Sequence, residues 1–202
     1  MKRIALTGGI ATGKSHVLAR LREAGVPAVD ADVLAREAVA SGSAGFQAVV
    51  SRFGNGVLAA DGTLDRRRLG SLVFGDERAR RDLESIVHPS VRAAIAAFFA
   101  ALPVGTPFAV ADIPLLYETG REKAFDAVIV VACDRETQIA RVIARDRLSR
   151  EEAEQRVAAQ LPIDHKRERA DYVIDSSGTH GDTDRQVAEL IATLQQQSHE
   201  AS

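Results

Sequence analysis

The chain begins with a phosphate-binding loop motif, and this motif constrains the fold more than any other stretch. Residues 8–15 read G-x-x-x-x-G-K-S, between an apolar run at residues 4–6 and a helix-like pattern at residues 17–21. Gly8 and Gly13 let the backbone turn tightly around an anion. The loop N–H groups and the first turn of the following helix then face its charge. The sequence therefore predicts a strand, a triphosphate-binding loop and a helix, and the flanking pattern makes a chance glycine turn the weaker alternative.

The motif also assigns roles to single side chains. We expect Lys14 to reach the β- and γ-phosphates and the Ser15 hydroxyl to contact Mg²⁺. Asp112 ends an apolar run at residues 108–112, where an aspartate that holds the metal is expected, although a lone aspartate at a strand exit is the alternative. The loop residues predicted to contact ATP are Gly9, Ile10, Ala11, Thr12, Gly13, Lys14, Ser15 and His16.

The composition narrows the class of protein. The 202 residues fit one domain with appendages, and a net charge of -2 argues against a general nucleic-acid binder. The single cysteine, Cys133, allows no internal disulfide and suits a reducing cytosol. The longest apolar run, residues 93–102, is about half as long as a membrane span. We expect a soluble cytoplasmic protein without nucleic-acid or membrane partners, as a monomer or weak homo-oligomer.

Strand-like runs alternate with helical patterns, which predicts a parallel sheet with helices on both faces. Asp30 and Asp32 follow the second of these runs, at an edge where α/β folds bind ligands. One of them would contact an acceptor hydroxyl while the other supports the loop or metal, or Asp32 would merely cap a helix over residues 33–39. The spacing leaves both alternatives open. The predicted strands cover residues 4–6, 26–29, 108–112, 127–132 and 170–175.

The segment between the second and third strands is too long for a simple crossover, so we expect it to form an acceptor-binding lobe. It holds a short amphipathic helix at residues 46–53 and an arginine run at 66–68. The arginine run is either a solvated face, the usual case, or a phosphate clamp. Helical periodicity then extends over residues 69–102, interrupted at His88-Pro89, where we expect Pro89 to open a new helix.

Arginines are dense from residue 135 to residue 156, and a lid over a triphosphate needs such guanidinium groups. The alternative is that these arginines pair with neighbouring carboxylates along a solvated helix. Apolar positions at residues 187–194 predict a last helix, and we expect the polar tail from Gln195 to fray.

Two classes of phosphate-loop protein can be tested against the sequence. Guanine recognition in switch GTPases uses N-K-x-D, and the only asparagine, Asn55, is followed by Gly56. An ABC-type ATPase would need a segment like L-S-G-G-Q, which the chain does not contain. The long helical insertion and the arginine-rich segment favour a phosphotransferase.

Over nearly its full length the chain resembles the dephospho-CoA kinase family. Three motifs are more specific to this family than the phosphate loop, which many families share. They are the aspartate pair Asp30 and Asp32, the P-L-L-Y-E sequence at residues 114–118 and the strand that begins A-D-Y at residue 170. The matching stretches are residues 6–10 with 13–15, 30–36, 61–66, 88–89, 114–118, 136–138 with Arg141 and Arg145, Gln160, and 170–175.

The resemblance implies transfer of the ATP γ-phosphate, with Mg²⁺, to the ribose 3′-hydroxyl of dephospho-CoA, giving coenzyme A and ADP. It implies a three-layer α/β fold with a five-stranded parallel sheet, all within a single kinase domain, residues 1–202. The nucleotide-binding core would cover about 1–31, 104–134 and 165–202, the helical CoA-binding region about 32–103, and the lid about 135–164.

By the same resemblance, Asp32 faces the 3′-hydroxyl and shares the catalytic work with Lys14. Arg141 and Arg145 would contact ATP from the lid. The residues expected on the acceptor side, besides Asp32, are Arg66, His88, Pro114, Leu115, Leu116 and Glu118.

The loop departs from the family pattern at two positions. Ala11 replaces a usual glycine, and a positive φ there would cost about 1 kcal/mol or more. His16 replaces a usual threonine and offers a ring N–H or a charge to the α-phosphate instead. We expect both to alter ATP affinity modestly. Two other functions stay open at this point: a kinase for another small hydroxyl acceptor, such as a nucleoside or sugar acid, or a catalytically weak CoA- or nucleotide-binding regulator.

Overall fold

A computed structural model describes residues 1–200 of the chain, and the side chains of residues 1–198. The chain divides into two compact units. The first unit, Met1–Val29 with Leu102–Ser202, contains the phosphate loop, and the second unit is Asp30–Ala101. Each unit is described below by itself.

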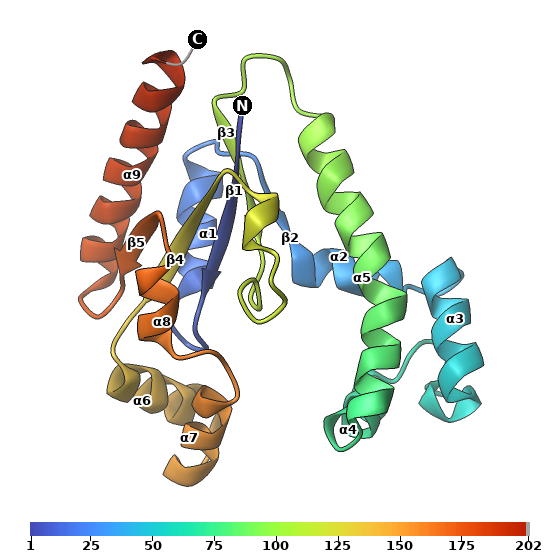
Figure 1. Ribbon diagram of the computed structural model, residues 1–202. Helices are drawn as coiled ribbons and strands as arrows, with labels where there is room; N and C mark the ends of the chain where they lie inside the picture. Colours follow the sequence, from blue (N-terminus) through green and yellow to red (C-terminus); the bar gives the residue numbers. More distant parts are fainter. Residues whose placement is uncertain (201–202) are drawn as a thin grey trace. The chain divides into compact units, whose positions relative to one another are not determined.

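Five strands form one sheet in the order β2-β3-β1-β4-β5 (Figure 1). The pairs β1–β3, β1–β4 and β4–β5 are all parallel, which confirms the predicted fold class. β3 and β4 have the predicted bounds, whereas β2 begins after Pro27 and β5 begins two residues later than expected. The strands are β1 (Lys2–Gly8), β2 (Ala28–Asp30), β3 (Phe108–Asp112), β4 (Ala127–Ala132) and β5 (Tyr172–Asp175).

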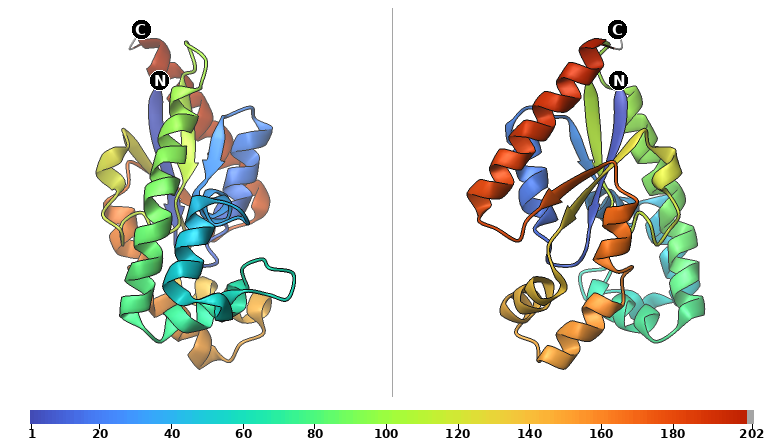
Figure 2. Two further views of the ribbon diagram at one scale, coloured as in Figure 1. Left: turned by 90° about the vertical axis from the view of Figure 1, so that its right-hand side faces the viewer. Right: turned by 60° about the vertical axis from the view of Figure 1, so that its left-hand side comes forward.

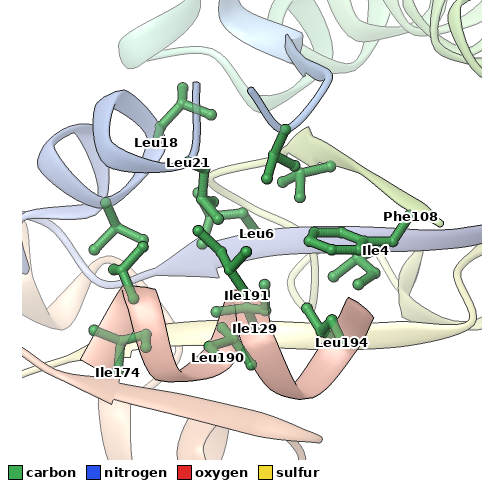
Figure 3. Packing of buried hydrophobic residues seen from close by; sticks show 14 of the residues in the cluster. Ile4, Leu6, Leu18, Leu21, Phe108, Ile129, Ile174, Leu190, Ile191 and Leu194 are labelled. Atoms are coloured by element: carbon green, nitrogen blue, oxygen red, sulfur yellow. The ribbon is translucent and has the colours of Figure 1, made fainter. Parts of the chain in front are cut away.

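The main core lies between the sheet and two helices, α1 (Lys14–Glu23) and α9 (His180–Glu200). Figure 3 shows side chains of α1 and α9 meeting Leu6 of β1 and Ile129 of β4. β4 is buried along its whole length and β1 is buried from Ile4 to Gly8, so their apolar side chains drive the packing by removing apolar surface from water. The labelled helix residues are Leu18, Leu21, Leu190, Ile191 and Leu194.

The remaining elements of the first unit follow β3 and β4. They are the short helix η2 (Glu122–Ala124), α6 (Arg135–Asp146), α7 (Arg150–Ala158) and α8 (Ile163–Glu168). α6 and α7 lie side by side near the end of β4, as the right-hand view of Figure 2 shows. Their contact is a small cluster of buried apolar residues, Ile139, Val142 and Ala153.

The expectation that the tail frays from Gln195 is wrong, because α9 continues to Glu200. The Gln197 side-chain oxygen accepts hydrogen bonds from Lys2 Nζ at 2.8 Å and from the Tyr172 hydroxyl at 3.0 Å. Ser198 Oγ donates to the carbonyl of Pro107 at 3.2 Å. These polar contacts join the end of α9 to the first residues of β1 and β5 and to the residue before β3.

The second unit is helical. Its elements are α2 (Ala31–Ala38), α3 (Ala44–Phe53), η1 (Asn55–Val57), α4 (Arg66–Phe74) and α5 (Glu77–Ala100). The long helix α5 packs against α2, α3 and α4 around a core of its own, formed by Val39, Val49, Val57 and Leu69. The three arginines at residues 66–68 are exposed in the first turn of α4.

Pro89 does not open a new helix, which corrects the expectation from the sequence. α5 runs without interruption through Pro89, although proline supplies no N–H to the carbonyl of Ser85. Buried residues lie on both sides of the proline, Ala79 before it and Val91, Ile95 and Phe99 after it. The packing of α5 against α2, α3 and α4 offsets the lost hydrogen bond.

Among residues 1–200, no helix combines the length and the apolar character that crossing a membrane requires.

Candidate active site

The phosphate loop connects β1 to α1 and has the backbone shape of an anion-binding turn. Gly13 adopts φ 82° at the N-terminus of α1, a conformation that favours glycine. Gly8 has no room for a side chain, because a Cβ there would lie 2.6 Å from the carbonyl oxygen of Val131 and 2.7 Å from Thr12 Oγ1. Both glycines of the motif are therefore required by geometry.

Ala11 has a positive φ of 58°, as the family comparison of this position suggested. A left-handed conformation costs a residue with a Cβ about 1–2 kcal/mol. The loop holds Ala11 there through Arg141, whose Nη1 lies 3.5 Å from the Ala11 carbonyl oxygen. Strain is thus stored at the point where the loop is expected to surround phosphate.

Lys14 and Asp112 form the central ion pair of the site. Lys14 Nζ lies 2.5 Å and 2.6 Å from the two carboxylate oxygens of Asp112, which is only 2% exposed. Asp112 ends β3, so the buried strand aims the carboxylate at the first turn of α1. Ser15, in that same turn, has an exposed side chain. The lysine, the carboxylate and the hydroxyl that the motif predicted therefore lie in one unit around one helix end.

Of the arginines in the dense segment, Arg141 lies against the phosphate loop. Its guanidinium donates to the Ser176 carbonyl at 2.7 Å, and Ser176 Oγ in turn donates to the Thr12 carbonyl at 2.6 Å. Arg145 instead forms a two-pronged pair with Asp146, which also accepts from Arg156. Arg150 bonds Glu136 and Glu154. Pairing with neighbouring carboxylates therefore describes Arg145 and Arg150, whereas Arg141 lies beside the phosphate loop.

Two glutamines hold the peptide groups of Ile10. The N–H of Ile10 donates to Gln160 Oε1 at 2.7 Å, and Gln138 Nε2 donates to the Ile10 carbonyl at 2.9 Å. Gln138 belongs to α6 and Gln160 follows α7, so two segments after β4 hold the loop at Ile10. Sequence reasoning quoted both residues as matching the family without giving either a role.

A cavity of about 240 Å³ opens beside the loop. His16 stands in its wall, with Nε2 2.7 Å from Asp184 Oδ1 and its ring in an edge-to-face contact with His180, 4.4 Å between centroids. This cavity adjoins the helix N-terminus and Arg141, which suits the part of a nucleotide next to its phosphates. The lining residues are Ala11, Gly13, His16, Arg141, Ser176, Gly178, His180 and Thr183.

Residues 114–118 form a turn against the end of β1. The Thr7 hydroxyl donates to the Pro114 carbonyl at 3.1 Å, Leu116 is wholly buried, and Leu115 is 45% exposed. Glu118 Oε1 accepts from the N–H of Leu161 at 3.0 Å and pairs with Lys166 Nζ at 2.7 Å. Of the predicted acceptor residues in this turn, Leu115 is the one whose side chain is most available to a ligand.

Sequence reasoning missed Lys166, whose side chain is 0% exposed. It lies in a run of charged residues on α8 and reads as part of a solvated face, so no local signal distinguishes it. Burial raises the pKa of the Cys133 thiol above its ordinary value, which leaves that cysteine a neutral core residue directly after β4.

In the second unit, Asp30 rather than Asp32 caps α2. Asp30 Oδ1 accepts from the N–H groups of Asp32 at 2.8 Å and of Val33 at 3.2 Å. The alternative in which Asp32 caps a helix over residues 33–39 is therefore wrong. Asp32 lies in the first turn of α2 with an exposed side chain that makes no hydrogen bond or ion pair among the described residues of its unit.

Arg66 and His88, the other predicted acceptor residues, belong to the second unit as well. Arg66 begins α4, where its guanidinium lies 3.4 Å from the carbonyl oxygen of Arg36. His88 is half-buried in the middle of α5, directly before Pro89.

A loop built for a triphosphate could serve a switch GTPase as well as a kinase. The chain has no guanine-reading N-K-x-D sequence, and it carries a separate helical unit inserted after β2. Three features together define a P-loop kinase: the parallel sheet, the helical unit inserted after β2, and the phosphate loop hydrogen-bonded by α6.

The comparison with protein families identifies which kinase. The family model for dephospho-CoA kinase matches residues 2–182, and the chain belongs to that family. The Geobacter sulfurreducens dephospho-CoA kinase is 48% identical over 193 residues, which cover 95% of this chain and 98% of that protein.

Solved structures agree with the family assignment. TT1252 from Thermus thermophilus matches with a TM-score of 0.81 and 37% identity, over 96% of this chain and 97% of that one. The dephospho-CoA kinase from Campylobacter jejuni matches with a TM-score of 0.74 and 27% identity over the same shares. The chain is thus an enzyme that uses ATP to phosphorylate dephospho-CoA, giving coenzyme A.

Proposed function

We propose that Asp32 orients the ribose 3′-hydroxyl of dephospho-CoA, and that Lys14 and Arg141 stabilise the γ-phosphate as it is transferred. The capping of α2 carries the first part of this proposal. Because Asp30 accepts both cap hydrogen bonds, the Asp32 carboxylate is left without a structural task in its unit. An exposed carboxylate in the first turn of a helix, with no side-chain bond among the described residues of its unit, is available to a substrate.

The role of Asp32 is orientation rather than outright deprotonation. Carboxylates are weak bases compared with a sugar alkoxide, so removing the hydroxyl proton before transfer would be unfavourable. Phosphoryl transfer mostly passes through a loose transition state with little bonding to the nucleophile. A carboxylate that holds the hydroxyl in line and accepts its proton late is then sufficient.

Stabilising the negative charge on the transferred phosphoryl group contributes more to catalysis than activating the hydroxyl does. Lys14, on the first turn of α1, would exchange part of its contact with Asp112 for the β- and γ-phosphate oxygens. The N–H groups of residues 11–15 and the positive end of α1 would add to this attraction. We propose that the other predicted ATP contacts act at the same place. They are the loop residues from Gly9 to His16, and Arg141 and Arg145 on α6.

Mg²⁺ is the divalent ion that we propose for the reaction. Ser15 and Asp112 supply the hydroxyl and carboxylate oxygens that this ion prefers, so the residues present fit it. When bound with ATP, Mg²⁺ neutralises charge on the phosphates. Asp112 would hold the ion and also keep Lys14 directed toward the loop.

The acceptor side is proposed to use Arg66 and His88 from the helical unit and the turn containing Pro114, Leu115, Leu116 and Glu118. Within this set, Leu116 and Glu118 would act mainly by shaping the turn, because one is buried and the other is paired with Lys166. We further propose that residues 32–103 bind the CoA moiety, that residues 135–164 act as the lid, and that the enzyme works in the cytoplasm as a monomer or weak homo-oligomer.

The acceptor assignment is tested by direct assay. The purified chain is incubated with ATP, Mg²⁺ and dephospho-CoA, beside nucleosides and small sugar acids, and both ADP and the 3′-phosphorylated product are followed. We expect turnover with dephospho-CoA alone. Comparable turnover with another hydroxyl acceptor, or binding of dephospho-CoA without any turnover, would contradict the proposal.

A further inference from the structure

The buried Lys166 has no part in the chemistry described so far. Its side chain is fully enclosed, so it cannot touch ATP, dephospho-CoA or a metal ion directly. A buried ammonium group is costly in free energy unless every neighbour compensates it, and an apolar residue of similar size would pack there more easily. The position of this lysine therefore calls for a reason other than packing.

The contacts of Lys166 supply that reason. Nζ donates to the carbonyl of Gly8 at 3.2 Å and pairs with Glu118 Oε1 at 2.7 Å. Gly8 is the last residue of β1 and the first residue of the phosphate loop. Glu118 belongs to the turn at residues 114–118. One ammonium group thus joins the start of the donor loop to the turn that we assign to the acceptor.

The same contacts continue into a closed ring. Glu118 Oε1 also accepts the N–H of Leu161 at 3.0 Å, and the preceding residue, Gln160, accepts the N–H of Ile10 at 2.7 Å. Ile10 is two residues beyond Gly8, so the ring leaves the loop at Gly8 and returns to it at Ile10. We call the side chains of Lys166, Glu118 and Gln160 the loop ring.

The loop ring holds the first part of the phosphate loop, at Gly8 and Ile10. The rest of the loop has other partners, because the Thr12 hydroxyl donates to the Gly9 carbonyl at 2.9 Å and Ser176 Oγ donates to the Thr12 carbonyl at 2.6 Å. The Gly8 carbonyl and the Ile10 N–H have the loop ring as their side-chain partners instead. A shift of these peptides would carry the rest of the loop with it.

We propose that Lys166 is a positioning residue for the kinase reaction, which acts through the Gly8 carbonyl and through Glu118 and Gln160. The inference rests on the donor and acceptor sites proposed above. It assigns Lys166 an effect on ATP binding and turnover although it contacts neither substrate. Misplacement of reacting groups by about 1 Å can lower a rate by about a hundredfold, so a small shift of the loop is enough.

The main variant is Lys166→Met, which keeps the length of the side chain and removes the ammonium group. We expect kcat per folded enzyme to fall about tenfold to a hundredfold and the Kd for Mg-ATP, measured calorimetrically without acceptor, to rise about tenfold. Lys123→Met is the matched control, because Lys123 is an exposed lysine of η2, and it should leave both quantities unchanged.

A purely structural role would predict that activity follows stability. The double variant Lys166→Met/Glu118→Gln removes the unpaired carboxylate while keeping an oxygen for the Leu161 N–H, so its Tm should recover toward that of the wild type. We expect the Kd for Mg-ATP to remain raised in the double variant. Recovery of Tm and of this Kd together would overturn the proposal, as would a Lys166→Met enzyme whose kcat and Kd stay within twofold of the wild type.

Three further outcomes are distinguished. A change confined to the KM for dephospho-CoA, with an unaltered Kd for Mg-ATP, would show that Lys166 acts on the acceptor turn alone and would overturn the link to the loop. If Lys166→Met does not fold, Gln160→Ala opens the same ring at Ile10 and should also raise the Kd for Mg-ATP, and a wild-type Kd there would overturn the proposal. A wild-type enzyme without turnover on dephospho-CoA would refute the acceptor site but leave the Mg-ATP comparison intact.

Discussion

Lys14 Nζ contacts both carboxylate oxygens of Asp112, at 2.5 Å and 2.6 Å, with Asp112 almost completely buried. The pair joins the first turn of α1 to the end of β3. A lysine held this way is directed toward the phosphate loop before any nucleotide arrives, which lowers the cost of ordering it on binding. The same carboxylate would offer anionic oxygens to a metal ion beside the loop.

The first prediction concerns Asp112. Asp112→Asn keeps the shape of the side chain and removes the charge that would hold Mg²⁺ and steady Lys14. We expect the Mg²⁺ concentration for half-maximal rate to rise about tenfold to a hundredfold, in the range found when groups that support a metal site are lost. The measurement is the initial rate against Mg²⁺ at saturating ATP. Asp126→Asn, which alters a surface aspartate paired with Arg3, is the control, and equal Mg²⁺ curves for both variants would refute the role.

The second prediction separates the two aspartates that follow β2. Asp32→Asn should lower kcat by about 10²–10⁴, the usual range for losing a residue that accepts a proton in the transition state. Its Tm should stay unchanged, because the Asp32 side chain makes no hydrogen bond or ion pair among the described residues of its unit. Asp30→Asn is the matched control: asparagine caps helices as well as aspartate does, so both Tm and kcat should stay close to the wild type. Near-wild-type turnover by Asp32→Asn would remove that residue from catalysis.

These two aspartates also show what the sequence could and could not predict. The sequence indicates the strand, the turn and the helix start, so the placement of Asp30 and Asp32 where β2 gives way to α2 was predictable. Which of the two caps the helix depends on backbone angles: Asp30 adopts an extended conformation, and its side chain reaches the N–H groups of the next turn. The sequence spacing allows either arrangement, so only the structure decides between them.

The strands β3 and β4 were predictable to the residue, because parallel strands buried on both faces are continuous apolar runs. Pro89 and Lys166 were not predictable, since tertiary packing overrides the local rule in each case. A proline continues inside α5 because both sides of it are packed, and a lysine in a charged run of α8 is buried because Glu118 and Gly8 lie where it points. In both cases the deciding partner is distant in the sequence.

A third prediction concerns Cys133 and pH. Burial raises the pKa of its thiol, so the folded chain favours the neutral form and loses that part of its stability as pH rises past the ordinary value for a thiol. We expect a thiol-specific chromogenic disulfide to react with Cys133 only after urea unfolds the chain. Rapid, stoichiometric reaction of the native enzyme at pH 8 would show that the thiol is accessible and ionised.

A fourth prediction concerns His16, which lines the cavity beside the loop and is anchored by Asp184. His16→Thr should raise the KM for ATP about twofold to tenfold with little change in kcat, because the catalytic residues stay in place while one wall of the cavity is lost. Asp184→Asn, which only weakens the anchor, should act in the same direction with a smaller effect. Steady-state kinetics in both substrates checks this, and His165→Thr, on the exposed face of α8, is the control. A change in the KM for dephospho-CoA alone would refute the assignment of the cavity to ATP.

The last prediction uses the two residues other than glycine that have a positive φ among residues 1–200, Ala11 at 58° and Arg147 at 55°. Glycine relieves about 1–2 kcal/mol of strain at such positions and loses about 0.4–1 kcal/mol through the entropy of the unfolded chain. Ala11→Gly and Arg147→Gly should therefore each raise the free energy of unfolding slightly, by up to about 1.5 kcal/mol, in urea titrations. Arg147 directly follows α6 and is not among the predicted ATP contacts, so its variant should leave the KM for ATP unchanged. Ala11→Gly should change this KM within about fivefold, and equal ATP kinetics in both variants would show that the strain at Ala11 affects stability alone.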